Sequence, residues 1–480
     1  MSNKYYITTP IYYVNAKPHI GHTYTTVSAD ILARYHKLIN KQVFFLTGTD
    51  EHGAKISEKA QEENINPQEF TDKISIEFQN VWKKLNISHD NFIRTTDDFH
   101  IKSVQNALQY MYDKGDIFLD KYEGLYCQGC EQYKNQKDLQ DGKCPDHKTK
   151  PEKMNEETYL FRMEKYAQKL LDKIEKDEIK IRPISKKNEI IKFYQQGLKN
   201  VSFSRQNVSW GIPLPWDKSH TAYVWSDAFL NYLTGLKWDG ANKPSEMFPP
   251  DMQLMSKDII RVHATIWLAM LLSLDLPLPK NFFVHGFFLI DGQKMSKSIG
   301  NIISPLDLIE KYGPDATRYL LISATPFGHD GDISWEKFDE KYNADLANGL
   351  GNLVARVSNM LEKNEITVSL KILSDSFLDE NTEHELTKKF ILKMNNIEID
   401  QALKVLWDEL RKNDEILTKK APWKIKDKKE VKKILEPIAQ SILDVTFLLQ
   451  PFMPEIAKNI INQFQQTQIK KEAILFQRIT

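Results

Sequence analysis

The stretch YYITTPIYYVNAKPHIGHTYT, residues 5–25, decides how the rest of the chain is interpreted. Residues 5–13 are rich in aromatic and β-branched side chains, which predicts a buried strand. Pro18 suits the first turn of a following helix, because the N–H that proline lacks would have no partner there. Apolar side chains then recur at spacings of three and four up to about Leu38, so an amphipathic helix is predicted directly after the strand.

Two histidines open this helix. His19 and His22 are three residues apart and therefore share one face of its first turn. A helix N-terminus presents backbone N–H groups to an anion, and two imidazole donors beside them suit a phosphate. Gly21 would let a flat ligand approach the backbone. A pair of surface histidines fits these few residues equally well, so the rest of the chain has to decide.

A second strand is predicted at VFFLTGTDEHG, residues 43–53, with a helix after it. This alternation is typical of a parallel sheet with crossover helices. Near Asp116 it gives way to a turn-rich stretch, and apolar patterns return at about residue 221. We expect an α/β fold in which a Rossmann-type doubly wound parallel sheet is split by a connective insertion and followed by an all-α bundle. The expected parts are the first sheet half, the insertion, the second sheet half, a loop region and the helical domain, at 1–115, 116–219, 220–290, 291–341 and 342–480.

The composition is that of an ordinary globular protein, since 41% of the 480 residues are hydrophobic and 27% are charged. Lysine and arginine total 65, as do aspartate and glutamate, so any polyanionic partner must be held by local basic patches. Three cysteines do not suggest a disulfide framework, and no apolar run fits a signal peptide or a bilayer span. We expect a cytoplasmic protein with no membrane partner.

A zinc site is the clearest local prediction, from the pattern Cys127-x2-Cys130-x13-Cys144-x2-His147. Two short knuckles of thiolate and imidazole ligands suit tetrahedral zinc. Four protein ligands would leave no open position, so one structural Zn²⁺ is expected. The alternative is a chance cluster of thiols.

KMSKS, residues 294–298, follows a strand predicted at 281–290. Lysines and serines on such a loop could reach the phosphates of a nucleotide. A solvated loop is the alternative in a lysine-rich chain. The position of KMSKS after a predicted strand favours phosphate binding, because ligands of doubly wound sheets bind at the carboxyl ends of strands.

An aromatic group comes from three separated segments: Tyr13, Trp225, Tyr232, His263 and Trp267. The last two are four apart in RVHATIWLAMLLSL, a stretch so apolar that a buried helix is predicted. Such rings could surround a thioether, since sulfur–aromatic contacts are favourable. Plain core packing is the alternative.

A lysine-rich segment, KKAPWKIKDKKEVKK at 419–433, holds eight lysines and one tryptophan. Phosphates could meet its charges while an unpaired base stacks on the ring. A solvated basic helix would have the same composition.

Taken together, these segments resemble the class I aminoacyl-tRNA synthetases, and specifically the methionyl-tRNA synthetase family, nearly from end to end. The resemblance rests on TTPIYYVNAKPHIGHTYT, FLTGTDEHG, GLYCQGCEQY, WGIPLPW, YVWSDA, KDIIRVHATIW, VHGFFLIDGQKMSKSIGN, GHDGDISWEKF, NADLANGLGNLVAR and APWK, in the family's order. The histidine motif and KMSKS are shared widely among synthetases, whereas the stretches between them point to methionine.

The resemblance implies a reaction in two steps. L-Methionine and ATP form methionyl-adenylate and pyrophosphate, and the methionyl group then passes to the 3′-terminal ribose of tRNA(Met), initiator or elongator. It implies that His19 and His22 bind the ATP phosphates, that Gly21 faces the adenine, and that Lys294 and Lys297 clamp the leaving pyrophosphate. Magnesium would accompany ATP.

The resemblance also implies the binding positions. The methionine pocket maps onto Pro10, Ile11, Tyr13, Asp50, Trp225, Ala228, Tyr232, Ile259, His263 and Trp267. Asp50 would pair with the substrate ammonium group, and Asp258 would approach the adenylate ribose. The anticodon CAU would be recognised by Asn352, Arg356 and Trp423.

Two residues depart from the family's usual pattern. Ser256 stands where GKDI would have glycine, and Ser226 replaces an aromatic residue in YVWSDA. Either could alter substrate affinity. No room is seen after Thr480 for the domain that dimerises some relatives, so a monomer is expected.

Other functions fit less well. Leucine, isoleucine and valine enzymes usually carry a large editing insertion, because one methylene gives only about 10–200-fold discrimination, and the insertion expected here is too short. A cysteine enzyme would place zinc in the amino-acid pocket. An inactive tRNA-binding paralogue conflicts with intact His19, His22, Asp50 and Lys297. A simpler nucleotidyltransferase would not account for the helical C-terminal domain.

Overall fold

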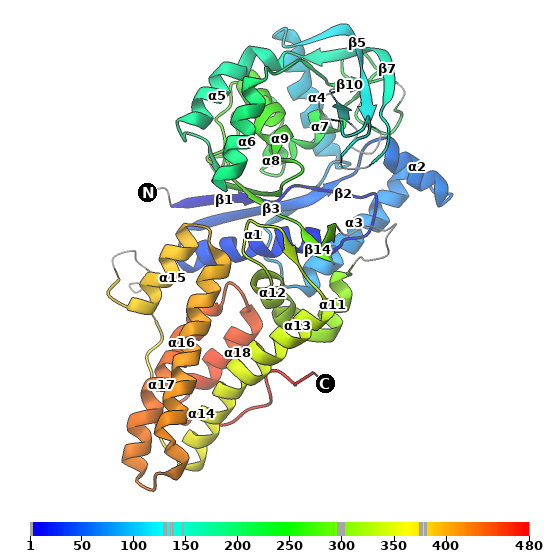
Figure 1. Ribbon diagram of the computed structural model, residues 1–480. Helices are drawn as coiled ribbons and strands as arrows, with labels where there is room; N and C mark the ends of the chain where they lie inside the picture. Colours follow the sequence, from blue (N-terminus) through cyan, green and yellow to red (C-terminus); the bar gives the residue numbers. More distant parts are fainter. Residues whose placement is uncertain are drawn as a thin grey trace.

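The computed structural model describes most of the chain. The described residues are 3–127, 132–134, 136, 139–145, 148–206, 208–290, 292–294, 303–373, 378 and 382–479. They form an upper part built on a parallel sheet and a lower part made of long helices (Figure 1).

The central sheet has seven strands, all paired in parallel. Its path runs through β2 (Tyr12–Tyr13), β3 (Gln42–Asp50), β1 (Lys4–Thr8), β12 (Met252–Ser256), β13 (Asn281–His285) and β8 (Lys180–Arg182), with β4 (Asn91–Arg94) also paired to β3. β1 therefore lies between β3 of the first half and β12 of the second. The strand order reverses at β1, and ligands of doubly wound sheets bind at the carboxyl ends of strands at such a point.

Helices cover both faces of this sheet (Figure 1). One face carries α1 (Ile20–Leu38), α3 (Pro67–Lys84) and α12 (Pro314–Ser323); the other carries α4 (Asp98–Asp113), α6 (Ile184–Gln195) and α10 (Leu268–Ser273). The alternation of side chains along β1 explains the two layers, because Tyr5 and Ile7 join the first core whereas Tyr6 joins the second. The Rossmann-type sheet expected from the sequence is confirmed.

Two predicted strands are each divided. Residues 5–13 form β1 and β2, with a break after Thr8. Residues 281–290 form β13 in the main sheet and β14 (Phe288–Ile290) in a separate sheet with β15 (Gln293–Lys294) and β16 (Gly331–Asp332), so the prediction of one strand was wrong. Gly286 makes the crossing possible, since a Cβ there would lie 2.3 Å from the backbone nitrogen of Asp330.

The segment 116–219 begins as a separate antiparallel sheet. That sheet contains β5 (Ile117–Cys127), β6 (Gln132–Lys134), β7 (Glu152–Phe161) and β9 (Val201–Ser202), and a short β10 (Ser204–Arg205) pairs with β11 (Thr221–Ala222). Between β7 and β9 the chain forms η2 (Met163–Tyr166), α5 (Ala167–Glu175), β8 and α6. Because β8 pairs with β13, part of the expected insertion belongs to the central sheet.

The remaining elements before α12 are short. They are α2 (Ala54–Glu62), α7 (Val224–Ala228), α8 (Asn231–Thr234), α9 (Ile260–Val262), the π-helical η3 (His263–Trp267) and α11 (Pro305–Tyr312). The predicted buried helix at 261–274 thus spans α9, η3 and α10, with a π-helical turn that the apolar pattern did not predict.

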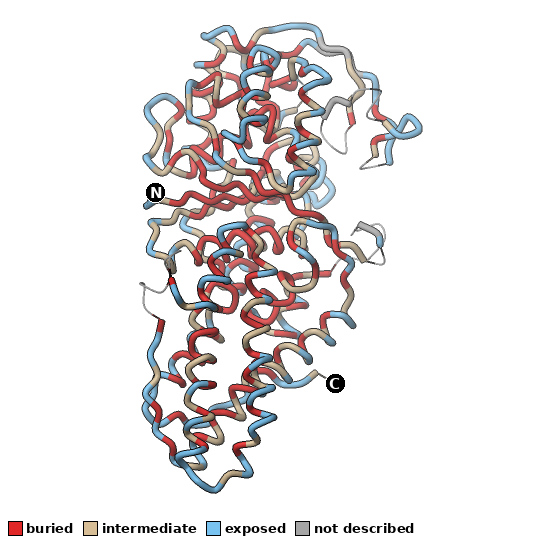
Figure 2. Tube along the Cα trace, turned by 60° about the vertical axis from the view of Figure 1, so that its left-hand side comes forward, coloured by how far each residue is buried: buried red, intermediate tan, exposed pale blue. Residues whose placement is uncertain are grey.

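The lower part confirms the helical C-terminal region. Its elements are α13 (Trp335–Lys341), the π-helical η4 (Tyr342–Gly351), α14 (Asn352–Lys363), α15 (Glu385–Asn395), α16 (Ile399–Lys420), η6 (Pro422–Lys424), α17 (Lys428–Leu449) and α18 (Pro454–Phe464). Figure 2 shows buried residues running through the sheet and along the inside of this bundle, with exposed turns at its far end. No helix within the described ranges is both long and apolar enough to cross a membrane.

A buried arginine of α12 links α1 to the segment before α18. Asp30 of α1 lies 2.7 Å from Arg318 of α12 and 2.8 Å from Arg34. Arg318 also donates to the backbone carbonyls of Pro451 and Phe452, which precede α18. Burial by itself would raise the pKa of Asp30, yet the two guanidinium groups hold that pKa below its usual value. The helix that carries the histidine motif is therefore linked to the helical bundle through Arg318.

Candidate active site

The N-terminus of α1 is capped by imidazole rings. His19 is the N-cap residue, so Pro18 precedes the helix and does not occupy its first turn as predicted. The His19 Nδ1 atom accepts a hydrogen bond from the Gly21 N–H at 3.0 Å, and the His22 Nδ1 atom accepts one from the His19 N–H at 3.3 Å. The two rings stack with centroids 3.8 Å apart. The structure thus brings the two predicted histidines together, in a reciprocal cap of the kind that Ser and Glu usually form.

The protonation of these rings follows from their contacts. Burial, followed by the neighbouring His19, holds the pKa of His22 well below its usual value, so His22 is neutral near pH 7. A neutral ring that accepts at Nδ1 carries its proton at Nε2. His22 therefore presents an Nε2–H donor, and His19 does the same in its neutral form. Two parallel donors of this kind suit the oxygens of a phosphate.

Gly21 lies directly under the first ring. A Cβ at this position would be 2.8 Å from His19 Cε1, so a larger residue here would have to displace the capping ring. The next turn of α1 contacts the second sheet half, because Thr25 Oγ1 lies 2.7 Å from His285 Nε2 at the end of β13. Sequence reasoning did not select His285, although a histidine at the carboxyl end of a predicted strand was available as a signal.

Asp50 ends β3 and lies beside Tyr13. The two residues are register partners in the parallel pair β2–β3, and the Val14 N–H donates to the Asp50 carbonyl at 3.1 Å. Asp50 is only 9% exposed. Pro10 and Ile11, both half-buried, occupy the break between β1 and β2 beside the same strand end. Strand pairing therefore gathers these four predicted pocket residues at the carboxyl end of the first sheet half.

Aromatic rings from α7, α8 and η3 form a wall. The Tyr232 hydroxyl is 2.8 Å from His263 Nε2, and His263 Nδ1 is 2.9 Å from the Ile259 carbonyl. Since only Nδ1–H can donate to that carbonyl, His263 accepts from the tyrosine. Burial lowers the pKa of His263 to about 4, which keeps the ring neutral. The half-buried Trp225 ring makes an edge contact with His263, with centroids 6.3 Å apart.

Phe229 is a member of this wall that sequence reasoning missed. Its ring lies 5.2 Å from Trp225, 4.9 Å from His263 and 5.9 Å from Trp267, measured between centroids. Its spacing of four from Trp225 was the available signal. Trp267 is fully buried and its Nε1–H donates to Gln253 Oε1 at 3.1 Å, so it forms the back of the wall.

Two further predicted pocket residues, and the two serines that differ from the family's usual pattern, belong to the segments that carry these rings or precede them. Ala228 is buried in α7, whereas Ile259 is half-buried before α9. Ser256, at the end of β12, donates a hydrogen bond to the exposed carboxylate of Asp258. Ser226 is buried and donates to the Tyr223 carbonyl at 2.7 Å, so its hydroxyl is used within the fold.

Two predicted elements lie partly outside the described residues. Lys294 is in β15, paired with Leu289, whereas Lys297 is among the residues that the structure does not describe. Of the four predicted zinc ligands, Cys130 and His147 are likewise outside the described ranges. Within those ranges no cluster of three potential metal ligands occurs.

The two described cysteines nevertheless fit a metal site. Cys127 and Cys144 are 1% and 0% exposed, although residues 140–143 and 148–150 around Cys144 are exposed. The Cys144 N–H donates to the Thr149 carbonyl, and the Lys148 N–H donates to the Cys144 carbonyl, both at 2.8 Å. A buried thiol in such a turn can supply the thiolate ligand that structural zinc accepts.

The predicted nucleic-acid residues gather on the helical bundle. The Arg356 guanidinium lies 5.4 Å from the centre of the Trp423 ring and forms an ion pair with Asp414 at 2.6 Å. Trp423 is 52% exposed, and Ala421 before it adopts a left-handed conformation, with φ of 43°. Asn352, one turn before Arg356 on α14, is also exposed. The structure thus places an uncovered indole beside a guanidinium, although the two are 67 residues apart.

Comparisons with known proteins agree with one another. The chain matches the family model described as tRNA synthetases class I (M), over residues 5–150 and 129–358. It is 42% identical over 473 residues to a methionine–tRNA ligase of Clostridium acetobutylicum, covering 96% of this chain and 73% of that protein. It is 40% identical over 507 residues to the enzyme of that name from Caldanaerobacter subterraneus, covering 100% of this chain and 79% of that protein. Among solved structures, Mycobacterium tuberculosis methionyl-tRNA synthetase in complex with methionyl-adenylate superposes with a TM-score of 0.89, at 36% identity, covering 96% of this chain and 94% of that one.

Proposed function

The chain belongs to the class I methionyl-tRNA synthetases, and we propose how its residues carry out the reaction of that family. The chain activates methionine with ATP, which gives methionyl-adenylate and pyrophosphate, and then transfers the methionyl group to tRNA. One observation carries the assignment of residues. The histidine cap of α1, the Asp50 carboxylate and the aromatic wall all lie at the carboxyl end of one parallel sheet.

The chemistry of the first step requires positioning more than a reactive side chain. The methionine carboxylate attacks the α-phosphorus in line with the leaving pyrophosphate, so no enzyme nucleophile is needed. His19 and His22 donate from Nε2 to phosphate oxygens as charge develops on them. The neutral state of His22 is supported by the burial that lowers its pKa.

Methionine is bound by charge at one end and by aromatic rings at the other. Asp50 pairs with the ammonium group, while Tyr13, Trp225 and the Tyr232–His263 pair surround the side chain. A thioether gains favourable contacts with aromatic rings. The remaining contacts come from Pro10, Ile11, Ala228, Ile259 and Trp267.

The adenine, the ribose and the pyrophosphate of ATP are each bound by residues other than the two histidines. Gly21 allows the adenine to approach α1, and Asp258 reaches the ribose from the end of β12. Lys294 and Lys297 clamp the pyrophosphate, and Mg²⁺ binds together with ATP. Ser256, which stands where the family usually has glycine, donates a hydrogen bond to Asp258 and would orient its carboxylate.

The helical bundle would select tRNA(Met), both initiator and elongator. Trp423 offers an exposed face on which a base can stack, and Arg356 and Asn352 offer hydrogen bonds to a neighbouring base. We assign anticodon recognition to residues 342–480 and catalysis to the two sheet halves, 1–115 and 220–290, with 291–341 between them. The consumption of charged tRNA in translation supports a cytoplasmic location. A monomeric state stays a prediction.

One structural Zn²⁺ would be held in the insertion, residues 116–219, by Cys127, Cys130, Cys144 and His147. When bound, the ion would supply a cross-link between two turns and no open coordination position for chemistry. The buried thiols in an exposed segment support this assignment.

Amino-acid-dependent ATP–pyrophosphate exchange tests the assignment. The purified protein is assayed with Mg²⁺ and each of the twenty amino acids, without tRNA. Exchange with methionine alone is expected. Exchange with another amino acid would contradict the pocket while preserving the class I chemistry. Exchange with none would contradict both.

A further inference from the structure

The two residues that follow Asp50 both enter buried polar networks. Glu51 and His52 are 0% and 4% exposed, and neither was assigned a role from the sequence. A carboxylate and an imidazole are costly to bury, so their presence side by side beneath a substrate-binding residue requires an explanation.

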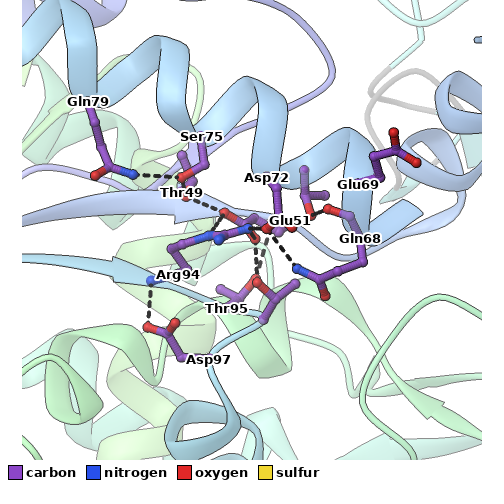
Figure 3. Close-up of polar contacts among 12 residues, drawn as sticks. Thr49, Glu51, Gln68, Glu69, Asp72, Ser75, Gln79, Arg94, Thr95 and Asp97 are labelled. Atoms are coloured by element: carbon purple, nitrogen blue, oxygen red, sulfur yellow. Dashed lines mark hydrogen bonds and ion pairs between the residues drawn. The ribbon is translucent and has the colours of Figure 1, made fainter. Parts of the chain in front are cut away.

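Glu51 forms a bidentate ion pair with Arg94 (Figure 3). Arg94 of β4 donates to its two carboxylate oxygens from Nε and Nη2, both at 2.8 Å. The Thr49 hydroxyl donates to Glu51 at 2.6 Å, and the Glu51 N–H donates to the Thr95 hydroxyl at 2.9 Å. Arg94 also pairs with Asp72 of α3. Glu51 is thus bonded to β3, β4 and, through Arg94, to α3.

His52 is held from the opposite direction. Its Nδ1 atom lies 2.6 Å from one oxygen of Asp227, and His100 Nε2 lies 2.7 Å from the other. His100 is fixed in turn by Thr234, whose hydroxyl is 2.7 Å from Nδ1. Asp227 is 1% exposed and belongs to α7, which also carries Trp225. His52 therefore connects the strand end of the first sheet half to the aromatic wall.

These contacts constrain Asp50 from both sides. The strand that carries Asp50 cannot shift toward or away from β4 without breaking the Glu51–Arg94 pair. Nor can it change its distance from α7 without breaking the His52–Asp227 bond. Because two good hydrogen bonds to a buried charge are strong, both constraints are stiff.

We infer that Glu51 and Asp227 are positioning residues, which hold the Asp50 carboxylate at a set distance from Trp225 and thereby determine the affinity for methionine. The inference rests on the proposed function of Asp50. Neither residue touches the substrate. Their effect passes through the backbone at the end of β3 and through α7, and it concerns methionine, whereas the histidine cap that binds ATP stands on α1.

The test uses conservative substitutions in the full-length protein. Glu51→Gln and Asp227→Asn keep the shape of each side chain and remove its charge. Asp116→Asn is the matched control, because Asp116 is also fully buried and accepts hydrogen bonds from Lys165 and Ser273 at 2.6 and 2.7 Å. The dissociation constant for methionine is measured by tryptophan fluorescence, together with KM for methionine and for ATP in pyrophosphate exchange, and with Tm.

Glu51→Gln and Asp227→Asn should weaken methionine binding on the order of 10-fold, the loss expected from a misplacement of less than about 1 Å. KM for ATP should stay unchanged. Asp116→Asn should lower Tm without changing the methionine affinity. Arg94→Lys should weaken methionine binding as Glu51→Gln does, since lysine keeps the positive charge but cannot form the bidentate hydrogen bonds. Arg94→Lys also replaces Glu51→Gln in the test if the Glu51→Gln protein does not fold.

Two results would overturn the inference. One is an unchanged methionine affinity in Glu51→Gln or Arg94→Lys. The other is a parallel loss of methionine and ATP affinity that follows Tm, as a merely structural role would give. Wild-type protein that binds no methionine would instead contradict the proposed function, so the two failures are distinguishable.

Discussion

Replacing His263 by glutamine tests whether the aromatic wall holds a neutral imidazole. His263 is 1% exposed and accepts from the Tyr232 hydroxyl while donating to the Ile259 carbonyl. Burial lowers its pKa from 6.5 to about 4. Protonation at Nε2 would remove the acceptor that the tyrosine uses, so the folded state resists it.

The sign of the pH dependence follows from the two pKa values. The unfolded chain protonates this imidazole below pH 6.5, whereas the folded protein does so only below about pH 4. The contribution of His263 to stability is therefore fully present above pH 6.5 and is lost as the pH falls toward 4. Between pH 7 and pH 5 the loss amounts to about 2 kcal/mol, at about 1.4 kcal/mol per unit of pKa difference.

The assay is urea unfolding followed by tryptophan fluorescence at the two pH values. Wild-type protein should lose about 2 kcal/mol more free energy of unfolding between pH 7 and pH 5 than His263→Gln does. His36→Gln is the control, since burial lowers the pKa of His36 to about 3 in a helix away from the wall. It should reduce the pH dependence similarly and leave methionine affinity intact, whereas His263→Gln weakens methionine binding. Equal losses in wild-type protein and His263→Gln would refute the reasoning.

Three further predictions concern the histidine cap, the exposed indole and the zinc ligands. A methyl group at Gly21 would lie 2.8 Å from His19 Cε1, so Gly21→Ala should displace the ring, remove a cap worth about 1 kcal/mol and slow pyrophosphate exchange; an unchanged exchange rate would contradict this. Trp423→Ala should lower tRNA charging by the loss of about 1–3 kcal/mol of base stacking while exchange stays normal, and a drop in exchange would show that the effect is not confined to tRNA. Cys127→Ser should release zinc, measured by atomic absorption, and weaken tRNA charging more than adenylate formation. Equal loss of both activities would mean that the insertion supports the active site itself.

Some of the site could be predicted because its signals are local. The spacing of three brings His19 and His22 together at the start of a helix whatever the rest of the chain does. The structure has their rings stacked, although His19 is the N-cap and does not lie in the first turn. The helical C-terminal region is predicted for the same reason, since a period of three and four residues is a property of neighbouring positions.

Other residues could not be selected from local pattern. Phe229 joins the aromatic wall only because η3 packs against α7, and a phenylalanine in an apolar stretch is ordinarily core. Glu51 and Asp227 look like surface acids in the motifs TDEHG and WSDA, yet both are buried. Residues 281–290 have the composition of one strand, but the approach of Asp330 at Gly286 divides them between two sheets.

The sequence by itself therefore determined the α/β character of the first part, the helical C-terminal region and the chemical character of each candidate group, because these depend on composition and short spacing. Only the tertiary structure decided which groups meet. Tyr13 and Asp50 become neighbours through the parallel register of β2 and β3, and Arg94 reaches Glu51 because β4 pairs with the same strand. Pairing of strands distant in sequence depends on how whole helices and sheets pack, and no short segment of the chain contains that information.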